Sequence, residues 1–514
     1  MSATIPTLGL ADGDPAEQAV DAVVIGVYSQ EADAPAPLLL ASGAESVAVA
    51  FDGKLVETLT LLGATGAVGE VTKLATLGTI TAPVVLAVGL GPEPAGQLPP
   101  AETLRRAAGA AARALSGTRT ALLALPVAEE PDGEPGTVRA LAEGALIGAY
   151  RFAGYKTTPG ARKDPLGTVT VHVPDAATRA VKAETKRATA VARAVARTRD
   201  WVNTAPNELR PPVFADEVAK AGEAAGLDVE VLDERALKRG GYGGILAVGQ
   251  GSTAPPRLVR LAYTPRGARK RVALVGKGIT FDTGGYALKP IQGMWDMKSD
   301  MAGAAAVAGT ILAAAALKPK VSIVAYLPIA ENMISGSAYR PGDVVTMYNG
   351  LKVEVLNPDA EGRMVLGDAM ARACEDEPDY LLETSTLTGG QVVALGKRVA
   401  GVMGTPELCE RVREAGEAVG EPAWPMPLPD DVRKGMDSDV ADISQINANM
   451  DRAGHMLQGG IFLSRFVAEG IPWIHLDVAG PAYHSGEPTG YWSKGGTGVP
   501  VRTFLELLDR IAAE

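Results

Sequence analysis

From residue 211 onward, short apolar runs alternate with longer stretches of helical periodicity, and this alternation limits the possible folds more than any other feature. The apolar runs are rich in Val, Leu and Ile and are expected to form strands at residues 272–275, 322–327, 353–356, 380–383 and 473–478. Helices are expected at 213–225, 301–317, 363–375, 407–419, 460–468 and 502–512. The alternation predicts a mostly parallel central sheet with helices on both faces, an α/β/α arrangement.

The first part of the chain predicts a separate, smaller α/β domain. Its expected strands are residues 22–27, 46–51, 84–88, 120–125 and 168–173, and its expected helices are 101–116 and 137–152. A long charged helix is expected at 180–201, and three prolines follow it within 203–212. We therefore expect an N-terminal α/β domain at 1–175, a linking helix at 176–202 and a catalytic domain at 203–514.

Composition argues against several classes of partner. The chain has 49 Lys and Arg against 60 Asp and Glu, a net charge of −11, so nucleic acids and anionic membranes are poor expected partners. The uncharged run at 301–317 is mostly alanine and glycine, which favours a buried soluble helix over a membrane span. Only two cysteines and the lack of a signal-like first segment predict a reducing, cytoplasmic location.

Histidine is scarce, which restricts the kind of metal site that the chain can build. The four histidines have no i, i+2 or i, i+4 pair among them: His172, His455, His475 and His484. Histidine-rich zinc motifs are therefore absent from the sequence. Any metal site must depend mainly on the oxygen ligands of Asp and Glu.

Charged residues gather just after the expected strands, where the active sites of parallel sheets lie. Lys277, Asp282 and Lys289 follow the first of these strands, and Asp300 directly precedes the alanine-rich helix. The strand expected at 353–356 is followed by a segment with a charged residue at every second position: Asp359, Glu361 and Arg363.

Four carboxylates that converge there would repel one another without a cation, and two divalent ions would both remove the repulsion and activate water for hydrolysis. The spacing of Asp359 and Glu361 would put both on the same side of an extended segment, and Arg363 continues that spacing. Any one of these residues alone is an ordinary loop charge or helix cap, so the interpretation depends on the whole set.

Several segments of this set resemble the leucyl aminopeptidase (cytosol aminopeptidase) family, and the resemblance covers about 200–514. They are VNTAPNE at 202–208, VGKGITFDTGG at 275–285, DMAGAA at 300–305, ENM at 331–333, YRPGD at 339–343, NPDAEGR at 357–363, TLTG at 386–389 and HLDVAG at 475–480. The resemblance implies an enzyme that releases N-terminal residues, preferably leucine and other apolar ones, from peptides. It also implies a homohexamer.

The resemblance further implies two divalent ions, Mn²⁺ or Zn²⁺, and a water bridging them as the nucleophile. One ion would bind Lys277, Asp282, Asp300 and Glu361, and the other would share Asp282 and Glu361 and add Asp359. A lysine ligand must be neutral, so the ions would have to lower the pKa of Lys277.

The family's catalytic pair corresponds to Lys289, which would stabilise the tetrahedral oxyanion, and Arg363, which would hold a bicarbonate ion as the proton shuttle. Asp300 would receive the substrate's free amine, and Lys289 and Asn357 would also contact the substrate. The first-residue pocket would be lined by Met297, Thr386, Gly389, Ala479 and Ala482, and the Leu387 carbonyl would contact the substrate backbone.

Two prolines depart from the family pattern without removing a ligand. Pro358 stands where threonine is usual, which removes a backbone donor and predicts a stiffer loop. Pro481 stands where other members carry a different residue, next to the predicted pocket residue Ala482. A non-catalytic binding or chaperone-like protein, a DNA-binding regulator, and a metal-dependent phosphatase or amidase are the alternatives to a peptidase.

Overall fold

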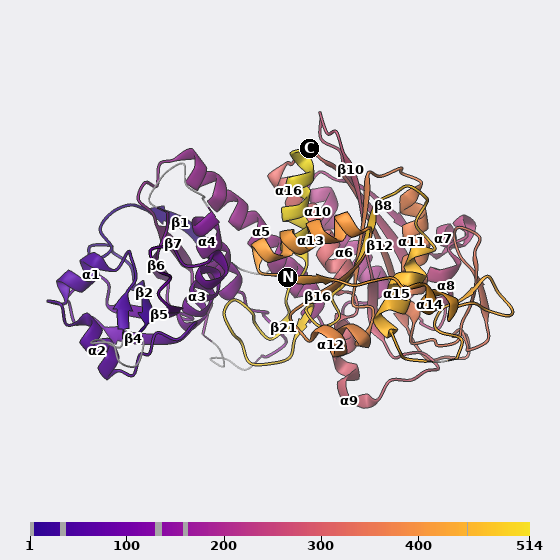
Figure 1. Ribbon diagram of the computed structural model, residues 1–514, viewed down its shortest axis with the longest axis horizontal. Helices are drawn as coiled ribbons and strands as arrows, with labels where there is room; N and C mark the ends of the chain where they lie inside the picture. Colours follow the sequence, from indigo (N-terminus) through magenta and orange to yellow (C-terminus); the bar gives the residue numbers. More distant parts are fainter. Residues whose placement is uncertain (1–4, 31–37, 129–135, 158–162, 450) are drawn as a thin grey trace. The chain divides into compact units, whose positions relative to one another are not determined.

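The computed structural model describes residues 5–30, 38–128, 136–157, 163–449 and 451–514, which divide into two compact units (Figure 1). The first unit comprises Met1–Ala196 together with Gly486–Lys494. The second comprises Arg197–Ser485 together with Gly495–Glu514. The chain passes from the first unit to the second inside the long helix α5 (Arg179–Asn203).

A mixed sheet forms the centre of the second unit, and its middle strands are parallel. Among the described residues it has nine strands. Their order is β17 (Ala423–Pro425), β16 (Ala400–Gly404), β19 (Trp473–Asp477), β15 (Tyr380–Ser385), β10 (Arg271–Gly276), β12 (Ser322–Asn332), β9 (Arg257–Tyr263) and β8 (Asp228–Leu232), with β11 (Gly278–Asp282) also paired to β12. The pairs β19–β15, β15–β10 and β10–β12 are parallel, whereas β9 and β8 run antiparallel at the edge. The predicted mostly parallel sheet is confirmed.

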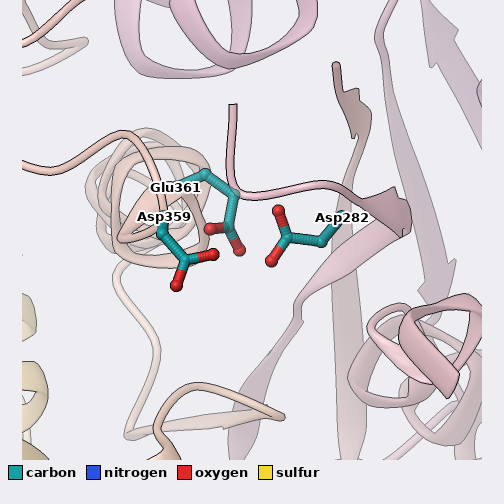
Figure 2. A group of neighbouring side chains, drawn as sticks. All are labelled: Asp282, Asp359 and Glu361. Atoms are coloured by element: carbon teal, nitrogen blue, oxygen red, sulfur yellow. The ribbon is translucent and has the colours of Figure 1, made fainter. Parts of the chain in front are cut away.

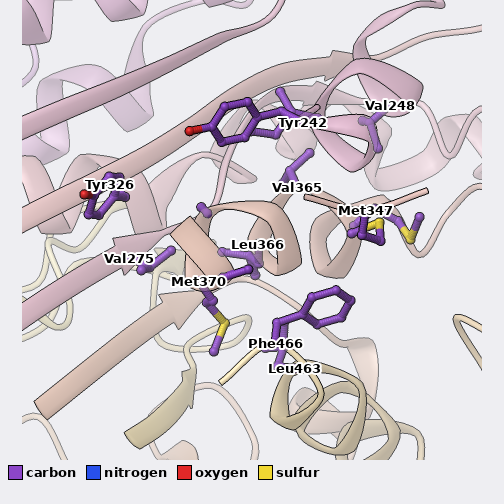
Figure 3. Close-up of a cluster of buried hydrophobic side chains, with 14 of the residues drawn as sticks. Tyr242, Val248, Val275, Tyr326, Met347, Val365, Leu366, Met370, Leu463 and Phe466 are labelled. Atoms are coloured by element: carbon purple, nitrogen blue, oxygen red, sulfur yellow. The ribbon is translucent and has the colours of Figure 1, made fainter. Parts of the chain in front are cut away.

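Helices cover both faces of this sheet (Figure 1). One layer contains α6 (Pro211–Ala224), α10 (Ala302–Leu317), α13 (Pro406–Val419) and α16 (Val501–Ala512). The other contains α7 (Glu234–Gly240), α8 (Gly243–Gly249), α11 (Glu361–Cys374) and α15 (His455–Ser464). Under the second layer lies a core in which Val275 of the sheet, Val365 and Leu366 of α11, and Phe466 are buried together (Figure 3). This burial of apolar side chains on both faces stabilises the sheet whose strand ends carry the site.

Helix α10 is the predicted alanine-rich helix, and it lies inside the second unit. Within the described residues, Ile291–Leu317 is the one helical stretch with the length and composition of a membrane span, and 78% of its most apolar window is buried. The stretch is also interrupted, because α9 (Ile291–Met294) and the 3₁₀ helix η1 (Trp295–Ser299) precede α10 and Gln292 and Gly293 are not helical. The stretch is therefore a buried core helix, α10, that is preceded by an irregular segment.

Two short sheets and two short helices complete the second unit. Strands β13 (Val344–Thr346), β14 (Lys352–Glu354) and β18 (Ile443–Ser444) form one sheet, and β20 (Tyr483–His484) pairs with β21 (Gly495–Gly496). The helices are α12 (Gly389–Leu395) and α14 (Asp430–Lys434). The run at 353–356 was expected in the central sheet, and this prediction was wrong. It lies in β14, because its partners are the short strands β13 and β18.

The first unit is a second α/β fold. Its described sheet has the order β1 (Thr7–Ala11), β7 (Thr168–His172), β6 (Thr120–Ala124), β2 (Ala22–Ser29), β5 (Val84–Pro92) and β4 (Val71–Ala75), with β3 (Leu38–Leu40) paired to β2. Successive residues of β2 face opposite sides, so Val24 packs with α3 (Ala101–Ala114) and α4 (Gly136–Gly148). Val23 packs with α1 (Glu45–Ala50) and α2 (Leu55–Leu61).

One predicted strand of the first unit is a helix. Residues 46–51 were expected to form a strand, but they lie in α1 and at its C-terminal end. Only Val47 of this helix is fully buried, so the helix rests on the sheet through one side. A short apolar run does not distinguish a strand from a short helix that covers a sheet.

Candidate active site

The predicted metal ligands come from separate segments of the second unit, and the structure brings them together. Lys277 links β10 to β11, and Asp282 is the last residue of β11. Asp300 lies between η1 and α10, while Asp359 precedes α11 and Glu361 is its first residue. All five side chains are buried except Asp359, which is partly exposed. The site therefore lies where the strand ends of the central sheet meet the start of α11.

Three of these carboxylates form a compact group. One oxygen from each of Asp282, Asp359 and Glu361 lies within 4.8 Å of the others. Figure 2 shows the carboxylates of Asp359 and Glu361, both near the start of α11, facing the carboxylate of Asp282. Carboxylate oxygens at this separation fit the coordination of a divalent cation.

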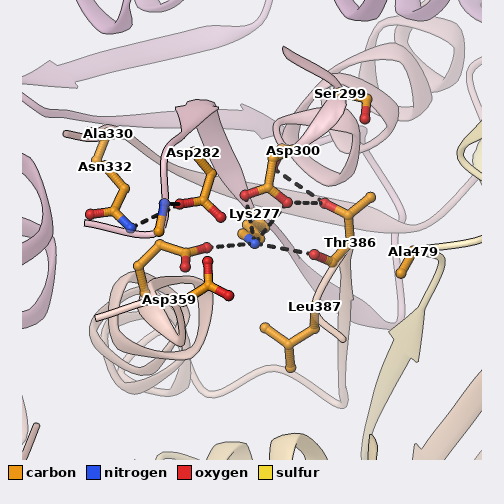
Figure 4. A network of polar contacts seen from close by, with 12 residues as sticks. Lys277, Asp282, Ser299, Asp300, Ala330, Asn332, Asp359, Thr386, Leu387 and Ala479 are labelled. Carbon is orange, nitrogen blue, oxygen red and sulfur yellow. Dashed lines mark hydrogen bonds and ion pairs between the residues drawn. The ribbon is translucent and has the colours of Figure 1, made fainter. Parts of the chain in front are cut away.

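Two lysines lie among the carboxylates. The Nζ of Lys277 is 2.8 Å from Asp300 Oδ2 and 2.8 Å from Glu361 Oε1, and Figure 4 shows it at the centre of these contacts. The Nζ of Lys289 is 2.8 Å from Asp282 Oδ2 and also forms an ion pair with Asp359. The lysines thus hold all four carboxylates in one network.

The charges of the site shift one another's protonation. Burial and the neighbouring carboxylates raise the pKa of Asp282, and burial raises the pKa of Asp359 to about 7. Burial alone would raise the pKa of Glu361, but Lys277 and Lys289 outweigh it and hold that pKa below its usual value. Negative charge is therefore in excess at this point, which is the electrostatic condition for binding cations.

Two observations test whether divalent ions fit these residues. Within the described part of the chain, the buried oxygens Glu361 Oε2 and Asn332 Oδ1 have no hydrogen-bond partner, so both retain lone pairs. Asp300 and Glu361 counteract the effect of burial and raise the pKa of Lys277, so its amine is protonated beside these two acids. The oxygen donors fit hard divalent cations, and Lys277 fits only after it gives up a proton.

Asn332 and Tyr339 are site residues to which sequence reasoning gave no role. Asn332 Nδ2 donates to Asp282 Oδ1 at 2.8 Å and to the carbonyl of Pro358 at 3.0 Å. The hydroxyl of Tyr339 donates to the same carbonyl at 2.7 Å. Both lie in segments that carried the family resemblance, which was the available signal. Asn332 and Tyr339 thus hold the loop before Asp359 through the carbonyl of Pro358. These two hydrogen bonds do not require the backbone N–H that proline lacks.

Arg363 does not continue an extended row with Asp359 and Glu361. That prediction was wrong, because α11 begins at Glu361 and Arg363 is its third residue. Arg363 is 2% exposed, and its Nη1 donates to the carbonyl of Gln445 at 2.6 Å. Gln445, which the sequence did not single out, also accepts from the backbone N–H of Asn357 at 2.8 Å. Burial lowers the pKa of Arg363 to about 10, which still leaves it protonated at neutral pH.

Some predicted pocket residues lie beside the carboxylates. Thr386 Oγ1 donates to Asp300 Oδ1 at 2.7 Å, and its carbonyl accepts from Lys277 Nζ at 3.1 Å. Figure 4 shows Leu387 and Ala479, from separate segments, on the same side of the site as Thr386.

The other predicted residues lie in adjoining segments. Asn357 Oδ1 accepts from the N–H of Asp359 at 3.0 Å, and the carbonyl of Met297 in η1 accepts from the N–H of Asp300 at 3.2 Å. Gly389 is the first residue of α12, and Ala482 is buried with its N–H bonded to Val478.

The comparisons with known proteins assign this mostly parallel α/β sheet, with acidic residues and lysines at its strand ends, to a class of peptidases. The chain belongs to the cytosol aminopeptidase family. Residues 196–505 match the model of the cytosol aminopeptidase family catalytic domain, and residues 24–159 match that of its N-terminal domain. The resemblance drawn from the motifs is confirmed.

Relatives match over nearly the full length. A probable cytosol aminopeptidase of Streptomyces griseus is 50% identical over 520 residues, covering 98% of this chain and 99% of the relative. One from Streptomyces coelicolor is 51% identical over 511 residues, covering 96% of each. The protein is therefore an aminopeptidase, and the predicted class of enzyme is confirmed.

Solved structures agree with this assignment. The bottromycin maturation enzyme BotP in complex with Mn is 36% identical, with a TM-score of 0.82 over 96% of this chain and all of that one. A mutant of tomato leucine aminopeptidase is 29% identical, with a TM-score of 0.84 over 98% of this chain and 96% of that one. The α/β fold of both units thus has solved counterparts.

Proposed function

We propose that the protein is a two-metal aminopeptidase that cleaves the first peptide bond of peptides and prefers leucine and other apolar first residues. The observation that carries the proposal is the convergence of Asp282, Asp359 and Glu361 within 4.8 Å, beside the buried pair Lys277–Asp300. The binding of Mn by BotP, a structural neighbour, supports a metal in this position.

One ion would be held by Lys277, Asp282, Asp300 and Glu361, and the other by Asp282, Asp359 and Glu361. Mn²⁺ and Zn²⁺ are the proposed metals. When bound, two such ions supply Lewis-acid activation of a water molecule and of the scissile carbonyl. The unpartnered Glu361 Oε2 supports a sharing role for this carboxylate.

Asp300 would receive the substrate's free α-amine. Its Oδ1 accepts from Thr386 Oγ1 at 2.7 Å, which fixes the orientation of the carboxylate. Lys277 is the positive partner of Asp300 in this structure. Once Lys277 gives up its proton to become a metal ligand, the buried carboxylate would need another partner, and the amino group of a peptide's first residue would provide it. This requirement for a free amine favours an aminopeptidase over a phosphatase or a general amidase.

Lys289 would act as the electrophile. Its Nζ lies 2.8 Å from Asp282 Oδ2, while its backbone N–H donates to Thr283 at 2.9 Å. Asp282 and the other acids outweigh burial and raise the pKa of Lys289, so it is an ammonium group at neutral pH. A preorganised ammonium donor of this kind stabilises the negative oxygen of a tetrahedral intermediate.

Arg363 would hold bicarbonate as a proton shuttle. Its Nη1 is fixed by Gln445, and its Nε has no hydrogen-bond partner within the described residues. A buried guanidinium group with a free donor suits a small anion. Held by Arg363, a bicarbonate ion would supply general acid–base chemistry between the attacking water and the leaving amine.

The first-residue pocket would be lined by Met297, Thr386, Gly389, Ala479 and Ala482. The Leu387 carbonyl would contact the substrate backbone, and Asn357 and Lys289 would also contact the peptide. Small and apolar side chains dominate this set, which supports the preference for leucine.

Three further expectations concern the whole chain. We propose an N-terminal domain at 1–175 with an oligomer-forming or regulatory role, a linking helix at 176–202, and a catalytic domain at 203–514. We also propose a cytoplasmic homohexamer. The net charge of −11 argues against nucleic acid as a partner.

The test is the release of p-nitroaniline from Leu-p-nitroanilide with Mn²⁺ or Zn²⁺. We expect activity to disappear on chelation and to return when the metal is restored. Substrate with a blocked amine, N-acetyl-Leu-p-nitroanilide, should not be cleaved, and p-nitrophenyl phosphate should not be hydrolysed. Asp359→Asn should be inactive, whereas Asp343→Asn, which alters a carboxylate paired with Arg340, should be active. Activity that survives complete metal removal would contradict the proposal.

A further inference from the structure

Asp477 is a buried carboxylate with no part in the proposed metal site, yet it joins two loops beside that site. It is the last residue of β19 and is 0% exposed. Its Oδ1 accepts from the backbone N–H of Leu387 at 3.3 Å and of Ala479 at 3.1 Å. Its Oδ2 accepts from Thr388 Oγ1 at 2.7 Å. One side chain therefore holds the loop after β15 against the loop after β19.

Neighbouring contacts reinforce this connection. Gln391 Oε1 accepts from the N–H of Gly480 at 2.7 Å, and the N–H of Val478 donates to Ser385 at 2.8 Å. Thr388 also caps α12, because its Oγ1 accepts from the N–H of Gln391 at 3.1 Å. The bonds to Asp477 thus lie within a set of contacts that fixes both loops.

The joined loops carry the residues proposed to form the pocket walls. Thr386 and Gly389 belong to the first loop and to the helix that follows it, and Ala479 belongs to the second. Side chains on these walls are mostly small, so the distance between the two backbones sets the width of the pocket. An apolar pocket distinguishes side chains that differ by a methylene group by about 10–200-fold, and only if its walls stay in place.

We propose that Asp477 is a positioning residue that fixes the width of the first-residue pocket and thereby the preference for leucine over smaller residues. The inference rests on the proposed aminopeptidase function. It assigns Asp477 no contact with the reacting atoms and no role in metal binding.

The test compares variants that keep or remove the bonds. Asp477→Ala removes both acceptor oxygens and with them all three hydrogen bonds. Asp477→Asn keeps them in altered form, because its amide oxygen accepts from both N–H groups and its NH₂ donates to Thr388 Oγ1. Thr388→Val removes the bond to Asp477 together with the cap of α12, whereas Thr388→Ser keeps both.

Asp368→Ala is the matched control. Asp368 is also a buried carboxylate, 0% exposed, and accepts from the backbone N–H groups of Ile245 at 2.9 Å and Tyr348 at 2.8 Å. It lies in α11 and binds segments that contribute nothing to the proposed pocket. The control therefore reports a general loss of stability without a change at the pocket.

The readouts are kcat/KM for Leu- and Ala-p-nitroanilide, and Mn²⁺ affinity by calorimetry. We expect Asp477→Ala to lower the Leu-to-Ala ratio about tenfold, mainly through KM for leucine, with Mn²⁺ affinity within about twofold of wild type. Asp477→Asn and Thr388→Ser should keep the ratio within about threefold, and Thr388→Val should lower it further than Thr388→Ser. Asp368→Ala should leave the ratio unchanged.

A Leu-to-Ala ratio that Asp477→Ala leaves unchanged would overturn the inference while the proposed function stands. An equal fall in Asp368→Ala would overturn it as well, since the effect would then be general. If Asp477→Ala fails to fold, equal ratios in Thr388→Val and Thr388→Ser would refute the proposal. Wild-type protein without aminopeptidase activity would overturn the proposed function itself, and this inference with it.

Discussion

Gly362 gives the sharpest test of the site's geometry, because the three atoms nearest to an added Cβ all belong to Lys277. It is the second residue of α11, between Glu361 and Arg363. A Cβ added to Gly362 would lie 2.6 Å from Cε and 2.8 Å from Nζ of Lys277. Carbon atoms in contact prefer a separation of about 3.5–4.0 Å, so Lys277 would have to move by about 1 Å.

The expected loss of activity caused by that movement follows from the burial of Lys277 and its ion pairs. It is 2% exposed, and its Nζ lies 2.8 Å from both Asp300 and Glu361. A misplacement of about 1 Å near the chemistry costs about 10²-fold in rate, which corresponds to about 2.7 kcal/mol. Alanine is favoured over glycine in a helix by about 1 kcal/mol, and this gain offsets part of the cost of crowding. Gly362→Ala should therefore lose activity while it stays folded.

The assay measures kcat/KM for Leu-p-nitroanilide at saturating Mn²⁺, Mn²⁺ affinity by calorimetry, and unfolding by denaturant. Gly136→Ala is the control, since Gly136 also lies in a helix and an added Cβ there meets no atom of the described residues within 4 Å. We expect kcat/KM to fall about 10²-fold and Mn²⁺ affinity to weaken in Gly362→Ala only. Wild-type activity and Mn²⁺ affinity in Gly362→Ala would refute the geometry on which the site depends.

Two other predictions concern the catalytic pair and a buried acid. Lys289→Ala and Arg363→Ala should each lower kcat by about 10²–10⁴-fold, and unchanged turnover in both would show that their roles are misassigned. Burial raises the pKa of Asp368 to about 7, so the folded protein keeps a proton that the unfolded chain releases near pH ~4. This contribution to stability is complete below about pH 4 and is lost as the pH rises through 7, so the stability of wild type relative to Asp368→Asn should fall between pH 5 and 8 in urea titrations. A difference that stays constant over this range would contradict the assignment.

The central strands could be predicted because their residues are buried on both faces. Strand β10 reads as an apolar run, and five of its six residues are buried. The helix α1 could not be predicted in the same way, because Glu45–Ala50 has too few residues to display a helical period. The position of β14 depended on pairing with β18, about 90 residues later in the chain, which no local pattern indicates.

The carboxylates and lysines of the site could be singled out because each charged residue follows an expected strand or precedes a helix. Asparagine and glutamine residues could not be singled out in this way. Asn332 reaches Asp282 across 50 residues of sequence, and Gln445 reaches Asn357 across 88. An amide in a sequence is compatible with any loop or core position, so only its tertiary contacts identify it as a support for charged neighbours.

The two lysines of the site differ in exposure, and the difference supports separate roles. The side chain of Lys277 is 3% exposed, and that of Lys289 is 22% exposed. A buried amine can contact only protein atoms or an ion bound inside the protein. A partly exposed ammonium group can also contact a peptide that enters from solvent. Lys277 also lies between Asp300 and Glu361, while Lys289 bridges Asp282 and Asp359 at the open side. The burial pattern therefore favours Lys277 as a fixed ligand and Lys289 as the group that contacts the reacting carbonyl, as we propose.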